Sequence, residues 1–320
     1  MSGLLMVEQR DGCSDAAPWV LDRLGHRLPG CDHDSRLAEL RAGLARHARV
    51  RGIVAEASNG DVERTLEKLH DPGYLEALGR VSSSEPLLMP EFAAPGLAAD
   101  TPVCAGLVAA AREGVRTAIT AAQRIVAGER FAYALCRPPG HHAGPGWLGG
   151  YCYLNNAAAA MQTLREGGVR SIGILDLDLH YPNGTSAIVA DMQDVSLHSL
   201  HAWPVANAPS PSVQPRSERE RLVDFRGDPE VASYLDAVAA SVDALARSAD
   251  VIILSLGYDT VVGDPHGGWS FSPPIFTRIG RLVAASGLPV CVIQEGGYAL
   301  NALAGCSHAF ATGLLDGGRP

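Results

Sequence analysis

Asp178 and His180 are the residues whose types and spacing first point to chemistry. One residue separates them, so in an extended segment both side chains project to the same side of the chain and can reach one ion. Asp259, which follows a different apolar run, can supply a third ligand. One imidazole and two carboxylates suit a catalytic Zn²⁺ with an open position for water, and Fe²⁺ or Co²⁺ fits the same set. Alternatively, these residues include no metal ligands, and the two aspartates are buried acids at the ends of strands that cap helices.

Two adjacent histidines, His141 and His142, follow a Pro-Pro-Gly turn. Beside a metal, such a pair can provide a general base and a second imidazole that stabilises charge. Each ring needs a partner that orients its far nitrogen, and Asp176 and Asn183 are the candidates. Without a metal nearby, adjacent histidines are more typical of a solvated loop.

Tyr298 is the candidate for stabilising an oxyanion. It follows Gly296 and Gly297, whose lack of side chains permits a tight backbone that brings the phenol close to the metal. Its hydroxyl can then donate to a tetrahedral oxyanion. The alternative is an ordinary buried tyrosine.

Asp176 has a second candidate role as a ligand of a structural cation. The Ser199 hydroxyl and the backbone carbonyls of Asp178, His180 and Leu200 can complete such a site. Hard oxygen ligands of this kind suit K⁺ or another alkali ion. This role is compatible with orienting a histidine.

The polar clusters follow short, β-branched apolar runs that alternate with longer helical patterns. Being apolar on both faces, the runs predict a parallel sheet covered on two sides, that is, an α/β fold. Because ligand sites in such sheets lie at the carboxyl ends of the strands, we expect one shared site. The predicted strands are 133–136, 171–175, 195–200, 251–256 and 289–293. The predicted helices are 103–127, 155–166, 229–249, 274–285 and 299–315.

Composition excludes several classes of protein. At 320 residues and 47% hydrophobic content the chain can bury a large core, so it is not a disordered chain. The net charge of −9 argues against a nucleic-acid or anionic-membrane partner. No apolar run is long enough to span a membrane. The seven cysteines are scattered without a CxxC pair, which supports neither a disulfide framework nor a thiolate zinc site. We therefore expect a cytoplasmic protein.

Six ordered sequence blocks together resemble the histone deacetylase superfamily, in its bacterial acetylpolyamine-amidohydrolase-like, class II-like branch. The resemblance runs from about residue 33 to about residue 315, and six ordered blocks are far more specific than any single motif. The blocks are RPPGHHA (137–143), GGYCYLNNAAAA (149–160), ILDLDLHYPNGT (174–185), HSLH (198–201), SLGYDTVVGDP (255–265) and EGGYAL (295–300).

The resemblance implies a single arginase/deacetylase-like domain over residues 1–320, with a parallel sheet of about eight strands and helices on both faces. It also implies a role for each matching residue. Asp178, His180 and Asp259 would be the Zn²⁺ ligands, His142 the general base and acid, and His141 its electrostatic partner. Asp176 would orient His141 and hold K⁺ with Ser199, and Tyr298 would stabilise the oxyanion. The implied substrate contacts are Tyr151, Gly150, Gly296 and Asp100.

Several stretches depart from the family pattern, and all concern substrate entry. Pro182 interrupts the segment after His180, and a Pro-, Ser- and Arg-rich stretch at 203–220, expected to be a surface loop, replaces the usual tunnel wall. His266 stands where some polyamine-selective members have a gatekeeper glutamate. This change weakens the assignment of a polyamine substrate.

The sequence therefore predicts a zinc-dependent deacetylase that hydrolyses an N-acylated amine to acetate and a free amine. The substrate stays open among acetyl-lysine, an acetylpolyamine and an acylated small molecule. The alternative is a non-catalytic protein that keeps an acyl-amine pocket, but such a protein is expected to lose a ligand, a histidine of the pair or the tyrosine. The oligomeric state is also open, with a homodimer as one arrangement.

Overall fold

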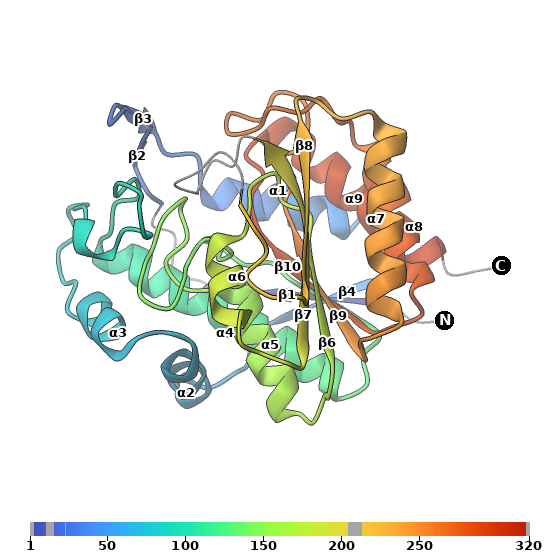
Figure 1. The fold of residues 1–320 in the computed structure, drawn as a ribbon, viewed down its shortest axis with the longest axis horizontal. Coiled ribbons are helices and arrows are strands. Elements are labelled where there is room, and N and C mark those ends of the chain that lie inside the picture. Colours follow the sequence, from blue (N-terminus) through green and yellow to red (C-terminus); the bar gives the residue numbers. More distant parts are fainter. Residues whose placement is uncertain (1–2, 11–15, 23, 204–212, 318–320) are drawn as a thin grey trace.

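Eight parallel strands form one twisted sheet in the computed structural model, which describes residues 3–10, 16–22, 24–203 and 213–317 (Figure 1). The spatial order of the strands is β4-β1-β5-β10-β9-β6-β7-β8. This arrangement confirms the predicted parallel α/β fold. In that order the strands are Val50–Val54, Leu4–Glu8, Phe131–Ala134, Val290–Gln294, Val251–Leu256, Ile172–Asp176, Val195–Trp203 and Glu220–Arg226.

The four central strands β5, β10, β9 and β6 are buried along their whole length. Apolar side chains alternate onto both faces, which is why these strands read as continuous apolar runs. The register sets Asp176 at the end of β6 opposite Ser199 of β7 and Ser255 of β9. Polar side chains that follow adjacent strands are thereby brought to one edge of the sheet.

Helices cover both faces of the sheet and bury two separate apolar cores (Figure 1). On one face α4 and α5 pack against the strands, with α2, α3 and α6 beside them; α1, α7, α8 and α9 cover the other face. In chain order, the α-helices of the described residues are Asp34–Leu44, Asn59–Leu69, Pro72–Gly79, Ala105–Val126, Asn156–Glu166, Asn183–Val189, Val231–Ala246, Pro274–Ala285 and Leu300–Asp316.

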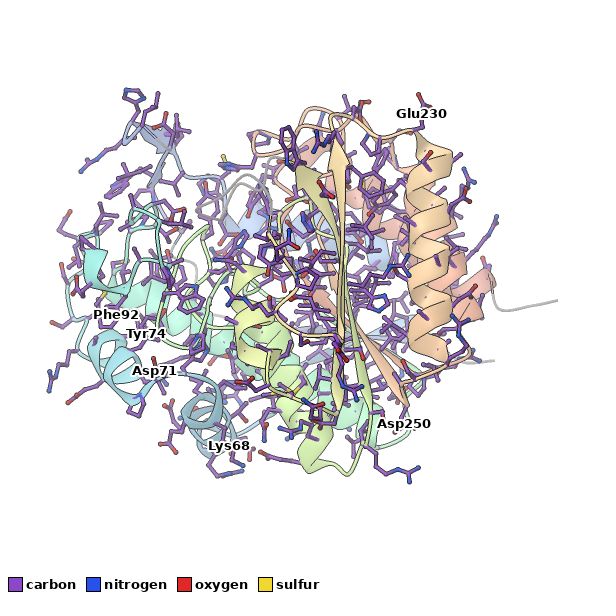
Figure 2. All side chains as sticks on the ribbon, in the orientation of Figure 1. Lys68, Asp71, Tyr74, Phe92, Glu230 and Asp250 are labelled. Atoms are coloured by element: carbon purple, nitrogen blue, oxygen red, sulfur yellow. The ribbon has the colours of Figure 1, made fainter. Side chains whose placement is uncertain are left out.

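The N-terminal third adds elements that the sequence analysis did not predict. Helices α1, α2 and α3 lie there. The strands β2 (Trp19–Leu21) and β3 (Arg27–Pro29) pair as a small antiparallel hairpin. A short 3₁₀ helix, η1 (Pro90–Phe92), packs onto α3 through Tyr74 and Phe92, whose ring centroids are 5.3 Å apart (Figure 2). Of these elements, α2 and α3 pack on the face of the sheet that α4 covers, whereas α1 packs against α9 on the other face.

The edge strands β4 and β8 were also missed, because their sequences are too polar to read as buried strands. Arg51 and Gly52 lie in β4, and four of the seven residues of β8 are charged. An edge strand has one unpaired side and tolerates such residues. Residues 213–219 of the loop predicted at 203–220 form neither helix nor strand, and its two end residues, Trp203 and Glu220, belong to β7 and β8. Residues 204–212 of the predicted loop lie outside the described residues.

Two further findings concern the cysteines and the helices. The six cysteines within the described ranges are free thiols. In the same part of the chain, every helix is either too short or too polar to cross a membrane.

The close crossing of α1 and α9 yields a stability prediction. A Cβ on Gly43 would lie 2.2 Å from the carbonyl oxygen of Ala304, so Gly43→Ala must push the helices apart. We expect a loss of about 1–3 kcal/mol in the free energy of unfolding, despite the better helix propensity of alanine. Urea denaturation measures the change. Gly79→Ala in α3 is the control, because no atom lies within 4 Å of its Cβ; equal effects at the two positions would contradict the prediction.

Candidate active site

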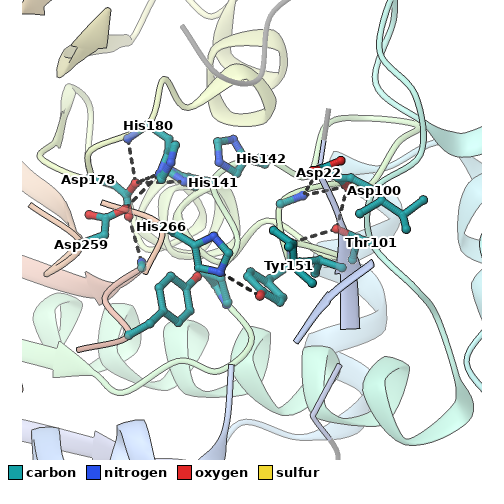
Figure 3. Close-up of a pocket in the computed structure, with 17 residues that line it drawn as sticks. Asp22, Asp100, Thr101, His141, His142, Tyr151, Asp178, His180, Asp259 and His266 are labelled. Atoms are coloured by element: carbon teal, nitrogen blue, oxygen red, sulfur yellow. Dashed lines mark hydrogen bonds and ion pairs between the residues drawn. The ribbon is translucent and has the colours of Figure 1, made fainter. Parts of the chain in front are cut away.

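The polar clusters meet in one pocket at the carboxyl ends of β5, β10, β9 and β6 (Figure 3). The pocket contains about 920 Å³ of empty space, part of it open to solvent. The lining has three parts: a deep polar end, an aromatic wall, and an outer wall that includes residues of β2 and β3. The lining residues are Val20, Leu21, Asp22, Leu28, Asp100, Thr101, Pro139, His141, His142, Gly150, Tyr151, Asp178, His180, Asp259, His266, Gly296 and Tyr298.

Asp178, His180 and Asp259 form the deep end of the pocket. One ligand atom from each lies within 4.8 Å of the other two. Nδ1 of His180 is 3.1 Å from Oδ1 of Asp178 and 3.0 Å from Oδ2 of Asp259. The structure therefore brings the three predicted ligands together, with one nitrogen and two carboxylates converging as a divalent metal site requires.

Backbone amides fix the two carboxylates from behind. The amide of Gly296 donates to Oδ2 of Asp178 at 2.9 Å, and the amide of Leu179 donates to Oδ1 of Asp259 at 3.0 Å. A Cβ at Gly296 would lie 2.7 Å from that Asp178 oxygen. Glycine is thus required here by a close approach, and one oxygen of each carboxylate stays directed toward His180.

The two carboxylates experience different electrostatic environments. Burial opposes ionisation of Asp178, but the neighbouring His141 and His180 outweigh it and hold its pKa well below the ordinary range. Burial raises the pKa of Asp259, and the adjacent Asp178 raises it further. Two buried acids in contact repel one another, so the site favours a divalent cation between them.

His141 and His142 lie beside the three predicted ligands, with ring centroids 4.0 Å apart. Nδ1 of His141 is 3.3 Å from Asp176, and Nδ1 of His142 is 2.8 Å from Oδ1 of Asn183. These are the two orienting partners that the sequence predicts. Glu295 holds the loop itself, because its carboxylate accepts from the amide of His141 at 3.1 Å.

The pKa values of the two histidines shift in opposite directions. Burial lowers the pKa of His142, and the neighbouring His141 and His180 lower it further, which favours the neutral form of this ring. Burial also opposes the charged form of His141, but Asp178 and Asp176 outweigh it and raise the pKa to about 10. Two adjacent imidazoles whose pKa values are shifted in opposite directions are suited to separate roles in proton transfer.

Tyr298 belongs to an aromatic wall with Tyr151 and His266, the two residues of this wall that are labelled in Figure 3. Its ring centroid lies 5.5 Å from that of Tyr151 and 5.1 Å from that of His266. The Tyr151 hydroxyl contacts Nε2 of His266 at 3.0 Å and accepts from the amide of Cys31 at 3.1 Å. The sequence departure at His266 is therefore part of the pocket wall.

The acids of the outer wall are occupied by local hydrogen bonds. Asp100 accepts from the amide of Gly150 at 3.2 Å and from the Thr101 hydroxyl at 2.8 Å. Asp22 accepts from the amide of His26 at 2.8 Å within its own turn. Asp100 and Gly150 thus brace one another in the pocket wall.

Asp176, Ser199 and Leu200 lie behind the His pair rather than in the pocket lining, and all three are buried. Asp176 and Ser199 are paired across β6 and β7. Oδ1 of Asp176 accepts from the amide of Asp178 at 3.1 Å, and the Ser199 hydroxyl contacts Nδ1 of His201 at 2.9 Å. The predicted oxygen ligands of a second cation therefore lie in neighbouring strands.

Sequence reasoning missed the buried Arg36, which packs directly against Tyr298. Its guanidinium lies 4.4 Å from the ring centroid of Tyr298, and it donates to the carbonyls of Gly297 at 2.6 Å and Glu295 at 2.7 Å. It also pairs with the buried Asp32. The only sequence signal was the short charged run around residues 31–36, whose distance along the chain from Tyr298 concealed the contact.

Comparison with known proteins assigns the family. The model of the histone deacetylase domain matches residues 32–314. The chain belongs to the histone deacetylase family. It is 34% identical to the acetylpolyamine amidohydrolase of Mycoplana ramosa over 77% of this chain and 81% of that protein. It is also 34% identical to acetylpolyamine amidohydrolase 1 of Pseudomonas aeruginosa, over 78% and 72%.

A solved structure gives the same result for the fold. The crystal structure of an acetylpolyamine aminohydrolase from Burkholderia pseudomallei superposes with a TM-score of 0.84 at 27% identity, covering 97% of this chain and 98% of that one. Together with the sequence relatives, this similarity shows that the chain is a hydrolase of the deacetylase type, acting on amide bonds.

The buried pair of acids leads to a prediction for metal binding. Zinc should raise the melting temperature of chelator-treated protein by several degrees, because binding at 1,000 times Kd stabilises by about 4 kcal/mol. Asp259→Asn should melt no lower than metal-free wild-type protein and should gain nothing from zinc. Differential scanning calorimetry measures both. The exposed Glu67→Gln is the control, and a full zinc response in Asp259→Asn would contradict the prediction.

Proposed function

We propose that this chain is a zinc-dependent amidohydrolase that cleaves an N-acetylated amine to acetate and the free amine. One observation carries the proposal: the ligand residues Asp178, His180 and Asp259 share a single pocket with the histidine pair and Tyr298. A non-catalytic acyl-amine-binding protein would need neither the histidines nor the tyrosine beside the ligands. We therefore favour the enzyme over that alternative.

The donor set fits a divalent ion, because each carboxylate is held by a backbone amide and presents an oxygen beside the His180 nitrogen. When bound, the ion would polarise the amide carbonyl and make the attacking water more acidic. Zn²⁺ is our assignment on ligand chemistry, and Fe²⁺ or Co²⁺ would suit the same residues.

His142 is the proposed general base and acid. Its Nδ1 is tied to Asn183, so the other side of the ring can take a proton from the attacking water and return it to the leaving amine nitrogen. His141, oriented by Asp176, would hold a positive charge beside the developing negative charge. The difference in pKa between the two rings supports this division.

Tyr298 is the proposed donor to the oxyanion. Its side chain is 9% exposed and lines the pocket beside the three ligand residues. The buried Arg36 guanidinium against its ring fixes the ring plane. A preorganised hydroxyl at such a place stabilises the tetrahedral intermediate without reorganisation during the reaction.

A structural K⁺ is a further part of this proposal, held by Asp176, the Ser199 hydroxyl and the backbone carbonyls of Asp178, His180 and Leu200. The pairing of Asp176 with Ser199 across adjacent strands supports the assignment. Because Asp176 also contacts His141, such an ion would help to set the charge of that ring.

The proposed substrate is an acylated aliphatic amine whose chain runs along the wall of Tyr151, His266 and Tyr298, with Gly150, Gly296 and Asp100 shaping the pocket. An acetyl-lysine side chain, an acetylpolyamine or another acylated small molecule has this form. Relatives named acetylpolyamine amidohydrolase support the class. We further propose a cytoplasmic protein without nucleic-acid or membrane partners, for which a homodimer is an allowed state.

Loss of the tyrosine hydroxyl should abolish most of the turnover. We expect Tyr298→Phe to lower kcat by about 10²–10³-fold, since one oxyanion donor contributes about that much, with KM and zinc stoichiometry little changed. Acetate release from an acetyl-lysine peptide and from N-acetylputrescine measures the effect. Tyr258→Phe is the matched control, because this buried phenol contacts Tyr133 outside the pocket lining. Stoichiometric zinc with no turnover of any acylated amine by wild-type protein would instead favour the binding-protein alternative.

The residue at position 266 should affect the choice between acylated amines with and without a free ammonium group. A carboxylate there would attract the one ammonium group that N-acetylputrescine keeps at its unacetylated end, so His266→Glu should raise the kcat/KM ratio of N-acetylputrescine to acetyl-lysine peptide by about tenfold, a gain of about 1.4 kcal/mol. The neutral variant His266→Gln should leave the ratio within about twofold of wild type. An equal ratio in the Glu and Gln variants would place the amine away from this wall.

A further inference from the structure

Asp264 joins two parts of the pocket wall through a single carboxylate. Its Oδ2 accepts from the amides of Tyr298 at 2.5 Å and Ala299 at 3.1 Å, and its Oδ1 accepts from the amide of His266 at 2.9 Å. The side chain is 9% exposed and does not line the pocket. The mechanism above gives Asp264 no role, yet it binds the backbone of Tyr298 directly.

The backbone around Tyr298 needs an anchor from outside its own segment. Gly297 has a φ of +115°, a conformation that side-chain-bearing residues rarely adopt. Helix α9 begins two residues after Tyr298, and its N-cap residue Ala299 has no side-chain acceptor. The amides at this helix start would therefore be unsatisfied without the Asp264 carboxylate, whose charge also suits a helix N-terminus.

Asp264 and the ligand residue Asp259 belong to one tightly folded segment. The amide of Val261 donates to the carbonyl of Tyr258 at 3.2 Å, and that of Asp264 donates to the carbonyl of Val261 at 3.3 Å. The amide of Gly267 closes the segment on the carbonyl of Asp264 at 3.1 Å. Successive turns thus link the metal-ligand end of the segment to the carboxylate that holds Tyr298.

Arg36 also binds the backbone of this segment, but it lacks the link to Asp259. It donates to the carbonyls of Glu295 and Gly297, whereas Asp264 accepts from the amides that follow. Arg36 lies on α1, which carries none of the three ligand residues. Of these two contacts, only the one with Asp264 ties Tyr298 to the segment that carries Asp259.

We propose that Asp264 is a positioning residue that sets the Tyr298 hydroxyl at its working place relative to Asp259. The inference rests on the proposed role of Tyr298. Misplacement of a reacting group by about 1 Å can cost about 100-fold in rate. In Asp264→Asn an NH₂ group, which is a donor, replaces one of the two acceptor oxygens. Both oxygens accept from backbone N–H groups in the wild-type protein, so the variant can keep the contacts of only one of them. The variant should therefore act on kcat through Tyr298.

A double-mutant cycle tests this coupling. In the zinc-loaded full chain, Asp264→Asn should lower kcat by about 10–100-fold and change KM by less than about threefold. In the Tyr298→Phe background, assayed at raised enzyme concentration, the same change should cost less than about threefold, because the hydroxyl that it misplaces is already gone. Asp264→Glu, which keeps both acceptor oxygens, should restore part of the lost kcat.

The matched control is Asp61→Asn in α2. Its carboxylate also accepts from a backbone amide at a helix start, that of Ser58 at 2.9 Å, but away from the pocket, so kcat should stay unchanged. An equal loss in both Tyr298 backgrounds, an unchanged kcat in Asp264→Asn, or failure of both Asp264 variants to fold would overturn the inference. A wild-type kcat in Tyr298→Phe would instead overturn the proposed role of Tyr298 itself.

Discussion

Asp178 and Asp259 are buried side by side, and the surrounding structure is built to hold two like charges in contact. Desolvation costs several kcal/mol for each ionised group, so each carboxylate is hydrogen-bonded to a backbone amide and shares His180 with the other. Those amides come from the ends of β6 and β10. The sheet order, which sets β6, β9 and β10 side by side, is therefore a requirement of the site as well as of the core.

Buried polar contacts also fix the other side chains around the two acids. Asp176 and Asn183 orient the histidine pair. Arg36 binds a carbonyl of the Tyr298 segment, and Asp264 binds its amides. Each of these groups is polar and nearly or fully buried. Because buried polar groups must be hydrogen-bonded, the network has few alternative arrangements, and this restriction preorganises the pocket.

The central sheet and the deep end of the pocket could be predicted because their signals are local. Apolar runs predicted the central strands. The spacing of Asp178 and His180 correctly predicted that both reach one site, although the chain bends at residues 178–180 and is not extended there as expected. The contacts of Arg36 and Asp264 could not be predicted, since they join residues far apart in the chain, and single charged residues give no sign of their partners. Edge strands such as β8 were not predicted, because their exposure to solvent gives them a polar composition like that of loops.

The measurement that tests the central claim most directly is a metal titration of turnover. Chelator-treated protein is supplied with zinc in steps, and acetate release from a saturating acetylated amine is followed. The account predicts that turnover rises linearly and reaches its plateau at one equivalent per chain, and that Asp259→Asn stays inactive throughout. Turnover that survives complete removal of the metal, or that persists in Asp259→Asn, would contradict the account.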